Sequence, residues 1–441
     1  MRALRVALAF SLAAILAACA GDSPAGTPLA TAPEGLPLDT TPELDRGGSA
    51  LNVAQPQATP TAQGAPGNRA ILVWWPDELY PQADSATENM LIGQFEGFRL
   101  TYSSYDLVVR RKRTHGLGGI LPTLRTARPV APAVVPDLTL MRPADMVTAA
   151  TEGLIFPIED WVPPDLLSNL LPGARALGEV DGTLYGLPYA LTIYHDAYRA
   201  SLLSGPLLTF DDVLSQEPTY LFPAGASPVS WTALLQYWAA GGRLVDQSGA
   251  ATLNREPLIA VLNYYAQGVR QGIFGSALLN YTQFSEYWND FASADIALIA
   301  VDTATYLSHK ASAQNVGLAP LPTLSGDPIT ALDGWVWVLT TNDPDHQPQA
   351  QAFVSWMMRI SQQSAYTEAF GILPSQERAL RLWEDEAYAT FAQGLIPFGE
   401  VISDTQRANS AAVALQESLV AVLEGAPVDS AADAALAKVA Q

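Results

Sequence analysis

Extended apolar segments alternate with helical segments from residue 70 onward, and this alternation restricts the possible folds more than any other feature of the chain. The segment "AILVWW" (70–75) predicts a buried strand, and Ser85 and Glu88 form a capping box that begins a helix. Two more strands are predicted in "YDLVVRRK" and in "PDLTLM" (136–141), and the helix "PADMVTAATEG" follows the second of them. Strands that alternate with helices in this way predict an α/β domain with a mainly parallel sheet.

A second alternating region follows residue 200. Thr209 and Ser230 stand at the N-cap positions of two predicted helices, "FDDVLSQ" and "WTALLQYWAA". Strands are predicted in "DIALIAV" and "GWVWVLTT", and the helix "AAVALQESLVAVLEG" lies close to the C-terminus. The length of 441 residues and the apolar content of 49% are sufficient for two large domains.

The N-terminus resembles an export signal. "MRALRVALAFSLAAILAAC" has a positive start, then an apolar stretch too short to span a bilayer, then small residues. Leu16 to Cys19 resemble the bacterial lipobox, and Cys19 is the only cysteine of the chain. We therefore expect residues 1–19 to be a lipoprotein signal peptide and Cys19 to be lipidated. The alternative is an ordinary signal peptide with a chance cysteine.

Residues 20–67 are rich in Ala, Pro, Gly, Thr and Gln, a composition that predicts a flexible disordered tether. The expected location is thus outside the cytoplasmic membrane, with the lipid as the sole membrane attachment. The net charge of −21 argues against a nucleic-acid partner, because neutralising phosphates requires a basic surface. The one dense basic run, residues 110–113, follows a predicted strand and is interpreted as a solvated strand end.

Several segments, in their order along the chain, resemble the family-1 extracellular solute-binding proteins of ABC importers, the group that includes maltose-binding proteins. They are "PDLTLMRPADMVTAATEGLIFPIEDW", "VDGTLYGLPYALTIYHDAY", "TFDDVL", "FASADIALIAV", "VGLAPLPT" and "AFGILPSQERAL". The sequence departs from the family pattern at "DGW" (333–335), where a Gly-Gly pair is commoner. The resemblance covers the chain from about residue 70 to the C-terminus.

The resemblance implies a type II periplasmic-binding-protein fold, an α/β architecture of two lobes joined by hinge strands, with a ligand cleft between the lobes. The first lobe is expected to hold residues 68–190 and 332–374, and the second to hold residues 191–331 and 375–441. The implied function is that of a monomeric, lipid-anchored protein that delivers a carbohydrate, a di- or oligosaccharide, to the permease of an ABC importer. Two alternatives remain at this point: a non-sugar ligand, such as a polyamine or a glycerol phosphate, and a sugar-processing enzyme.

Candidate ligand residues follow from where predicted strands end, because open α/β sheets bind ligands beyond the carboxyl ends of their strands. Trp75, Asp77, Arg142 and Asp145 occupy such positions. Trp74 and Trp75 alternate along one strand, and Trp75, nearer its end, is the better candidate. The Arg142 guanidinium can pair with a ligand or with a neighbouring carboxylate.

Sugar rings pack on aromatic faces, and their hydroxyls pair with carboxylates and other polar groups. Trp75, Trp231, Trp288 and Trp335 are therefore candidates, although packing in the core is an equal alternative for each. Asp302 directly follows the strand "DIALIAV" and is a candidate acceptor for a hydroxyl.

The stretch "GTLYGLPYALTIYHDAY" (182–198) is expected to cross from the first lobe to the second. Strand alternation places Thr192 and Tyr194 on one face and Tyr189, Leu191 and Ile193 on the other. By ungapped alignment with the family pattern, Tyr194 falls where a ligand-contacting polar residue often lies, and Thr192 shares its face. Thr192 and Tyr194 are therefore predicted to face the ligand. The alternative is that Tyr194 only packs within the hinge.

No catalytic or metal-binding pattern is found in the chain. The four histidines are scattered without ligand spacing, and there is no Gly-x-Ser-x-Gly motif. We therefore expect no cofactor, no metal and no enzymatic activity. A glycosidase would need two carboxylates across a sugar bond, and a sequence alone leaves that alternative open.

Overall fold

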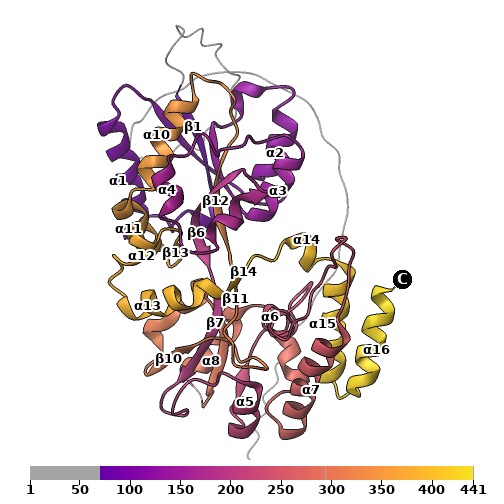
Figure 1. The fold of residues 1–441 in the computed structure, drawn as a ribbon. Coiled ribbons are helices and arrows are strands. Elements are labelled where there is room, and N and C mark those ends of the chain that lie inside the picture. The colour runs from indigo at the N-terminus through magenta and orange to yellow at the C-terminus, as the bar shows by residue number, and fades with distance from the viewer. Residues whose placement is uncertain (1–69, 294, 441) are drawn as a thin grey trace, which may run out of the picture. The chain divides into compact units, whose positions relative to one another are not determined.

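The computed structural model describes residues 70–293 and 295–440, which belong to one compact unit. Two mixed β-sheets with helices around them make up this part of the chain (Figure 1). The expected signal peptide, Cys19 and the tether lie outside the described residues. Among the helices described, none combines the length and the apolar character needed to cross a membrane.

The first sheet has six strands in the order β13-β6-β12-β3-β1-β2. They are β1 (Ile71–Pro76), β2 (Leu107–Lys112), β3 (Leu138–Met141), β6 (Gly186–Thr192), β12 (Asp333–Leu339) and β13 (Leu373–Pro374). Strand β1 runs parallel to β2 and β3, but β12 runs antiparallel to β3 and β6, and β13 runs antiparallel to β6. The prediction of a mainly parallel sheet is therefore wrong. Local patterns identify a strand but do not fix the direction in which it returns from a distant part of the chain.

Helices cover both faces of the first sheet. Val73 and Trp75 of β1 pack with Phe95 of α1 (Ala86–Thr101), whereas Leu72 and Trp74 pack in the cluster that contains α2 and α3. The helices on the face of Val73 are α1, α10 (Gln347–Met357) and α11 (Ile360–Phe370), and those on the opposite face are α2 (Ile120–Ala127) and α3 (Pro143–Thr151) (Figure 1). Every residue of β1 is buried, because both sides of the strand are covered.

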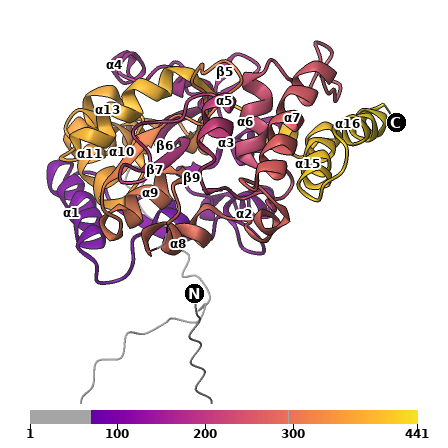
Figure 2. The same cartoon turned by 90° about the horizontal axis from the view of Figure 1, so that it is seen from below.

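The second sheet has four strands in the order β10-β7-β9-β8. They are β7 (Tyr194–Arg199), β8 (Tyr220–Leu221), β9 (Leu298–Asp302) and β10 (Val316–Ala319). The helices of this half are α5 (Phe210–Gln216), α6 (Trp231–Ala239), α7 (Arg255–Gln271), α8 (Trp288–Ser293), α9 (Thr303–His309), α13 (Glu386–Leu395), α15 (Ser410–Leu423) and α16 (Val428–Val439). Helices α7, α15 and α16 lie side by side in both views (Figures 1 and 2).

The remaining elements are short. They are the helices α4 (Pro164–Ser168), α12 (Glu377–Leu380) and α14 (Asp404–Arg407), the hairpin β4 (Glu179–Val180) with β5 (Thr183–Leu184), and the pair β11 (Thr330–Ala331) with β14 (Gly399–Glu400). Three of the predicted caps can be compared with the structure. Ser85 and Thr209 accept backbone hydrogen bonds at helix starts as predicted, but the Ser230 side chain makes no capping bond.

The chain passes from the first sheet to the second at Ile193, between β6 and β7. The Ile193 amide donates to the Thr303 hydroxyl at 3.0 Å, and the Tyr194 amide donates to the Thr330 hydroxyl at 2.8 Å. Strand β6 also contains a bulge, since Val336 of β12 pairs with Pro188 and Trp335 pairs with Ala190. The extra residue, Tyr189, shifts the alternation of the strand.

This bulge corrects one predicted face of the crossing stretch. Tyr189 and Leu191 were expected on the same face, but Tyr189 packs with Trp75 and Trp337, and Leu191 belongs to the other hydrophobic cluster. Pro188 has no amide to donate to the ladder, and irregular pairing beside such a residue is common.

Candidate functional site

A cavity of about 430 Å³ lies where elements of the two halves meet. One wall comes from the first sheet and its helices, including the start of α3, and the other comes from the start of α6 and from α14 with the loop before it. The polar and aromatic residues that line the cavity are Glu78, His115, Arg142, Asp145, Thr148, Glu179, Trp231, Asp333, Ser403, Asp404, Thr405 and Arg407.

Arg142 organises the wall on the side of the first sheet. It directly follows strand β3 and precedes α3, so its guanidinium reaches the cavity from the end of the sheet. It bonds Glu78 at 3.0 Å, lies 3.6 Å from the Asp333 carboxylate and covers the Trp335 ring, with 4.3 Å from Cζ to the ring centroid. Burial by itself lowers the pKa of Arg142, but the two carboxylates more than compensate and raise it. The guanidinium therefore stays charged.

Asp145 lies in the first turn of α3, where the partial positive charge of the helix N-terminus favours a carboxylate. The nearest ring that can pair with it is that of His115, whose Nδ1 lies 3.8 Å from Oδ2 of Asp145. Burial raises the pKa of Asp145, and the negative charges of Asp404 and Glu78 raise it further, while His115 acts against them.

Asp333 is in a similar position at the start of β12. Burial raises the pKa of its carboxyl, Arg142 lowers it, and Asp404 raises it again. Asp404 thus acts electrostatically on two carboxylates of the opposite wall, which places these three groups around one space.

The second wall is built around Trp231, the first residue of α6. The Arg407 guanidinium lies over its ring, with 4.1 Å from Cζ to the ring centroid, and the Tyr194 ring stacks against it at 4.7 Å. Arg407 also lies 3.4 Å from the Asp404 carboxylate. Its Nε is buried and has no hydrogen-bond partner among the described residues.

Tyr194 lies behind this wall and is only 7% exposed. Its backbone is held by Thr330, whereas its hydroxyl makes no hydrogen bond within the described part of the chain. Burial raises the pKa of Tyr194 well above its ordinary value, and the charges of Asp333 and Asp302 add to the effect. Thr192 stands opposite Asp333 in the register of β6 and β12. These two predicted residues therefore adjoin the cavity without lining it.

Two predicted carboxylates have structural partners. Asp77 accepts hydrogen bonds at 3.0 Å from both the amide and the hydroxyl of Thr114, and these bonds outweigh burial and lower its pKa. It lines a neighbouring hollow that shares Glu78 and His115 with the cavity. Asp302 caps α9 by accepting from the Thr305 amide at 2.8 Å.

Three predicted tryptophans do not reach the cavity surface. Trp75 is fully buried among aromatic rings, including Trp337 at 5.6 Å and Phe95 at 5.4 Å, so the preference for it as a ligand contact is not met. Trp288 is 1% exposed and donates to Ser312 at 2.9 Å. Trp335 is 4% exposed and lies under Arg142. Position at a strand end does not bring a side chain to the site when both faces of the sheet are covered.

The structure therefore brings Arg142, Asp145 and Trp231 together in the cavity and adds residues that sequence reasoning missed. The added ionisable groups are Glu78, His115, Glu179, Asp333, Asp404 and Arg407. Two of them could have been found from the sequence. Glu78 directly follows Asp77, which was a candidate, and Asp333 lies in "DGW" (333–335), where the sequence differs from the family pattern. The short helix α14 carries a capping box at Ser403, but its sequence does not indicate which wall it joins.

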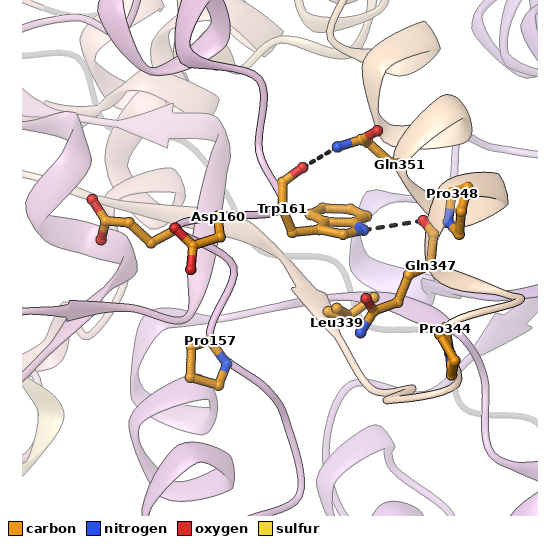
Figure 3. Close-up of a pocket in the computed structure, with 9 residues that line it drawn as sticks. Pro157, Asp160, Trp161, Leu339, Pro344, Gln347, Pro348 and Gln351 are labelled. Carbon is orange, nitrogen blue, oxygen red and sulfur yellow. Dashed lines mark hydrogen bonds between the residues drawn. The ribbon is translucent and has the colours of Figure 1, made fainter.

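A second hollow, of about 370 Å³, lies on the first half alone, beside Trp161 (Figure 3). The Trp161 indole donates to the Gln347 carbonyl at 3.0 Å, and the Gln351 side chain donates to the Trp161 carbonyl (Figure 3). These polar groups already satisfy one another, and no wall of the other half faces them. The cavity around Arg142 is the better candidate site. Among the described residues, no group of three or more His, Cys, Asp or Glu could hold a metal ion.

Comparison with known proteins is informative at the level of the family. Residues 117–393 match the family model described as bacterial extracellular solute-binding protein, which covers more than half of the chain. A curated relative, the maltotriose-binding protein of Pyrococcus abyssi (strain GE5 / Orsay), is 32% identical over 88 residues. That match spans only 20% of this chain and 19% of the relative.

Solved structures share the fold at low sequence identity. The cyclic alpha-maltosyl-1,6-maltose binding protein of Arthrobacter globiformis superposes with a TM-score of 0.66 at 18% identity, covering 85% of this chain and 98% of that one. The sugar-binding protein MalE of the phytopathogen Xanthomonas citri gives a TM-score of 0.69 at 16% identity, covering 84% and 96%. These likenesses confirm the expected two-lobed α/β fold.

Proposed function

Because the chain belongs to the bacterial extracellular solute-binding proteins, we propose that it captures a carbohydrate in the cavity around Arg142 and delivers it to an ABC-type importer. Solute binding without catalysis is the activity of the family, which disfavours the enzymatic alternative. The observation that carries the proposal is that both halves of the structure contribute walls to one cavity. A ligand that contacts both walls binds more tightly when the two halves are close together. It therefore favours the closed arrangement over the open one, which is the basis of hinge closure.

The chemistry of the cavity suits a di- or oligosaccharide. Trp231 lines the cavity, and carboxylates, guanidiniums and hydroxyls supply hydrogen-bonding groups from both walls. A volume of about 430 Å³ lies within the usual range for small-molecule sites. The relative from Pyrococcus abyssi is named for maltotriose, and the solved structures mentioned above are named for binding maltosyl sugars or sugar, which supports the same class.

The proposed lobes follow the two sheets. The first holds residues 68–190 and 332–374, and the second holds residues 191–331 and 375–441. The strands agree with this division, apart from the last residues of β6, which remain in the first sheet. In this proposal the monomeric protein is held at the outer face of the cytoplasmic membrane by a lipid on Cys19. Replacement of Cys19 by Ala should release the protein from the membrane fraction and abolish labelling by a fatty-acid analogue.

Calorimetric titration against a panel of mono- and oligosaccharides tests the carbohydrate assignment. The expected result is saturable binding of at least one sugar, with no product after prolonged incubation. If no sugar in the panel binds or raises the melting temperature, the carbohydrate assignment fails. Appearance of a cleaved sugar would contradict the binding function itself.

A further inference from the structure

A run of four cations ends strand β2. Arg110, Arg111 and Lys112 are the last residues of the strand and Arg113 follows it, and the three arginines are exposed. None of the four forms an ion pair with a described residue. In a chain with a net charge of −21, these residues, 110–113, make a basic patch on an otherwise acidic protein.

The basic patch lies along a free edge of the first sheet. Strand β2 is the last strand in the order of that sheet, so one of its edges has no paired strand among the described residues. Successive side chains of the strand point to opposite faces. Lys112 lies over the Trp74 ring, with 4.7 Å from Nζ to the ring centroid, and Arg111 lies over the Tyr80 ring on the other face, with 5.2 Å from Cζ to the centroid. Cations from both faces therefore gather along this one edge.

The carboxylates beside the basic patch have other partners. Asp77 and Glu78 line a hollow of about 360 Å³ together with Arg111 and Arg113. Asp77 already accepts two hydrogen bonds, and Glu78 pairs with Arg142 at 3.0 Å. The patch thus keeps a positive excess that a partner from outside can use.

Leu117 adds an exposed apolar side chain close to the basic patch. It is 94% exposed and lies in the loop between β2 and α2. The Ile120 amide closes this loop by donating to the Arg113 carbonyl at 2.9 Å, and the flanking Gly116 and Gly118 have φ angles of 73° and 77°. This left-handed backbone favours glycine, which has no side chain to cover the leucine. One exposed leucine is ordinary, but an apolar side chain beside clustered cations is the combination that interfacial segments present to an anionic bilayer.

We propose that the basic patch and Leu117 form a docking surface for a bilayer that contains anionic lipids. The cations contact the headgroups and Leu117 inserts between them. An acidic protein would match the cations, but a single leucine in a loop offers it little apolar area to pack against. A fluid lipid surface admits one side chain readily.

The contact would also orient the cavity. His115 lies between the basic patch and Leu117 in the sequence, and it lines the cavity around Arg142. Docking therefore turns this rim of the cavity toward the membrane, where an importer receives its ligand. The docking surface goes beyond the proposed function, and only its orienting role rests on that function.

Vesicle flotation tests the docking surface. The chain without the expected signal peptide and lipidated cysteine, residues 20–441, keeps every described residue except none of the anchor. Vesicles of phosphatidylcholine alone are compared with vesicles that hold equal parts of phosphatidylglycerol, at about 20 mM and about 150 mM salt. At low salt we expect at least about tenfold stronger partition into the anionic vesicles, and most of this preference should disappear at the higher salt. The contact is then too weak to retain the protein without its lipid, in agreement with the release expected for Cys19→Ala.

A double variant locates the charge contribution. Arg110→Gln with Arg113→Gln should weaken partition into anionic vesicles by about 10- to 30-fold, because each cation near such a surface contributes about fivefold. Arg270→Gln with Arg378→Gln removes two exposed cations at other places and gives the same net charge. This control should lose less than about threefold.

A second variant tests the apolar contact. Leu117→Ser should weaken partition by about three- to tenfold, because the leucine no longer inserts. Leu324→Ser, which replaces a leucine that is 53% exposed in the second half, should have no effect. Melting curves of each variant establish that it is folded.

The possible outcomes are distinct. Equal partition into the two kinds of vesicle at low salt would overturn the docking surface. Equal losses in the patch variant and in its net-charge control would overturn its position. Binding to polyglutamate without partition into anionic vesicles would identify an acidic protein as the partner and overturn the bilayer. A failure to bind any sugar would remove the carbohydrate function and leave the vesicle result standing.

Discussion

The guanidinium of Arg142 lies 4.3 Å from the ring centroid of Trp335 and simultaneously contacts two carboxylates, Glu78 and Asp333. Its wall of the cavity therefore depends on one cation that joins a loop after β1 to the start of β12. Loss of this cation leaves two partly buried carboxylates without the guanidinium that lies nearest to both of them.

We predict that Arg142→Ala lowers the free energy of unfolding by about 1–2 kcal/mol, a reduced value for a partly exposed ion pair. Urea unfolding measures the change. Arg125→Ala removes the partner of Glu152 in an ion pair at the surface, and should change the free energy of unfolding much less than Arg142→Ala does. Equal losses of unfolding free energy in the two variants would show that the ion pairs of Arg142 stabilise the fold no more than an exposed pair does.

Tyr194→Phe is predicted to change ligand affinity by less than about twofold, because Tyr194 does not line the cavity and the variant ring keeps its stacking on Trp231. The melting temperature should change little, since the variant keeps the stacked ring. Calorimetry and melting curves provide the two readouts. A loss of affinity of about tenfold would show instead that the Tyr194 hydroxyl reaches the ligand. Tyr102→Phe, at the C-terminal end of α1 and outside the cavity, is the control.

Ligand binding is predicted to change tryptophan emission, and the change should come from Trp231. Among the described residues, Trp231 alone of the tryptophans lines the cavity, whereas Trp288 is 1% exposed in the core of the second half. Trp231→Phe should remove most of the ligand-induced change and Trp288→Phe should retain it. A signal that persists in Trp231→Phe and disappears in Trp288→Phe would contradict the position assigned to the site.

The pH dependence of stability should reflect Asp145. Burial and the neighbouring carboxylates raise its pKa in the folded protein, so the native state binds the proton more tightly than the unfolded state does. Stability from this group is therefore greatest at low pH and is lost as pH rises from the ordinary value of 3.8 through the raised pKa. Asp145→Asn should consequently stabilise the unliganded protein more at about pH 7 than at about pH 4.

Urea midpoints of the wild type and Asp145→Asn at the two pH values measure this difference. The charged groups around Asp145 are His115, Asp404, Arg125 and Glu78, and they remain in both proteins. Asp429→Asn, at the exposed start of α16, controls for net charge. A stabilisation that is independent of pH would show that the carboxyl titrates alike in both states.

Sequence reasoning was most reliable where the signal was local. The strand at residues 71–76 and the helix after Ser85 follow from apolar runs and a cap, and both are present. The predicted parallel direction of the strands in the first sheet was wrong, because β6, β12 and β13 come from distant parts of the chain and pair antiparallel. Pro188 signalled irregular pairing, but the bulge at Tyr189 depends on the partner strand β12.

The site was predicted less completely than the fold. Arg142 was predicted at the end of a strand, where it could pair with a ligand or with a carboxylate. In the structure it lines the cavity and also pairs with Glu78. Trp75 was misplaced because a strand covered on both faces hides every side chain. Asp404 and Arg407 lie more than two hundred and fifty residues beyond Arg142, and no local pattern connects them.

The threonine contacts at the crossing have a mechanical consequence. Where β6 becomes β7, the amides of Ile193 and Tyr194 bond to the hydroxyls of Thr303 and Thr330 rather than to a neighbouring backbone. A hydroxyl swings about its own side-chain bonds, so it can follow an amide through a modest change of backbone angle. The joint can therefore bend while its buried amides remain bonded, and little of the binding energy of a ligand is consumed in moving it.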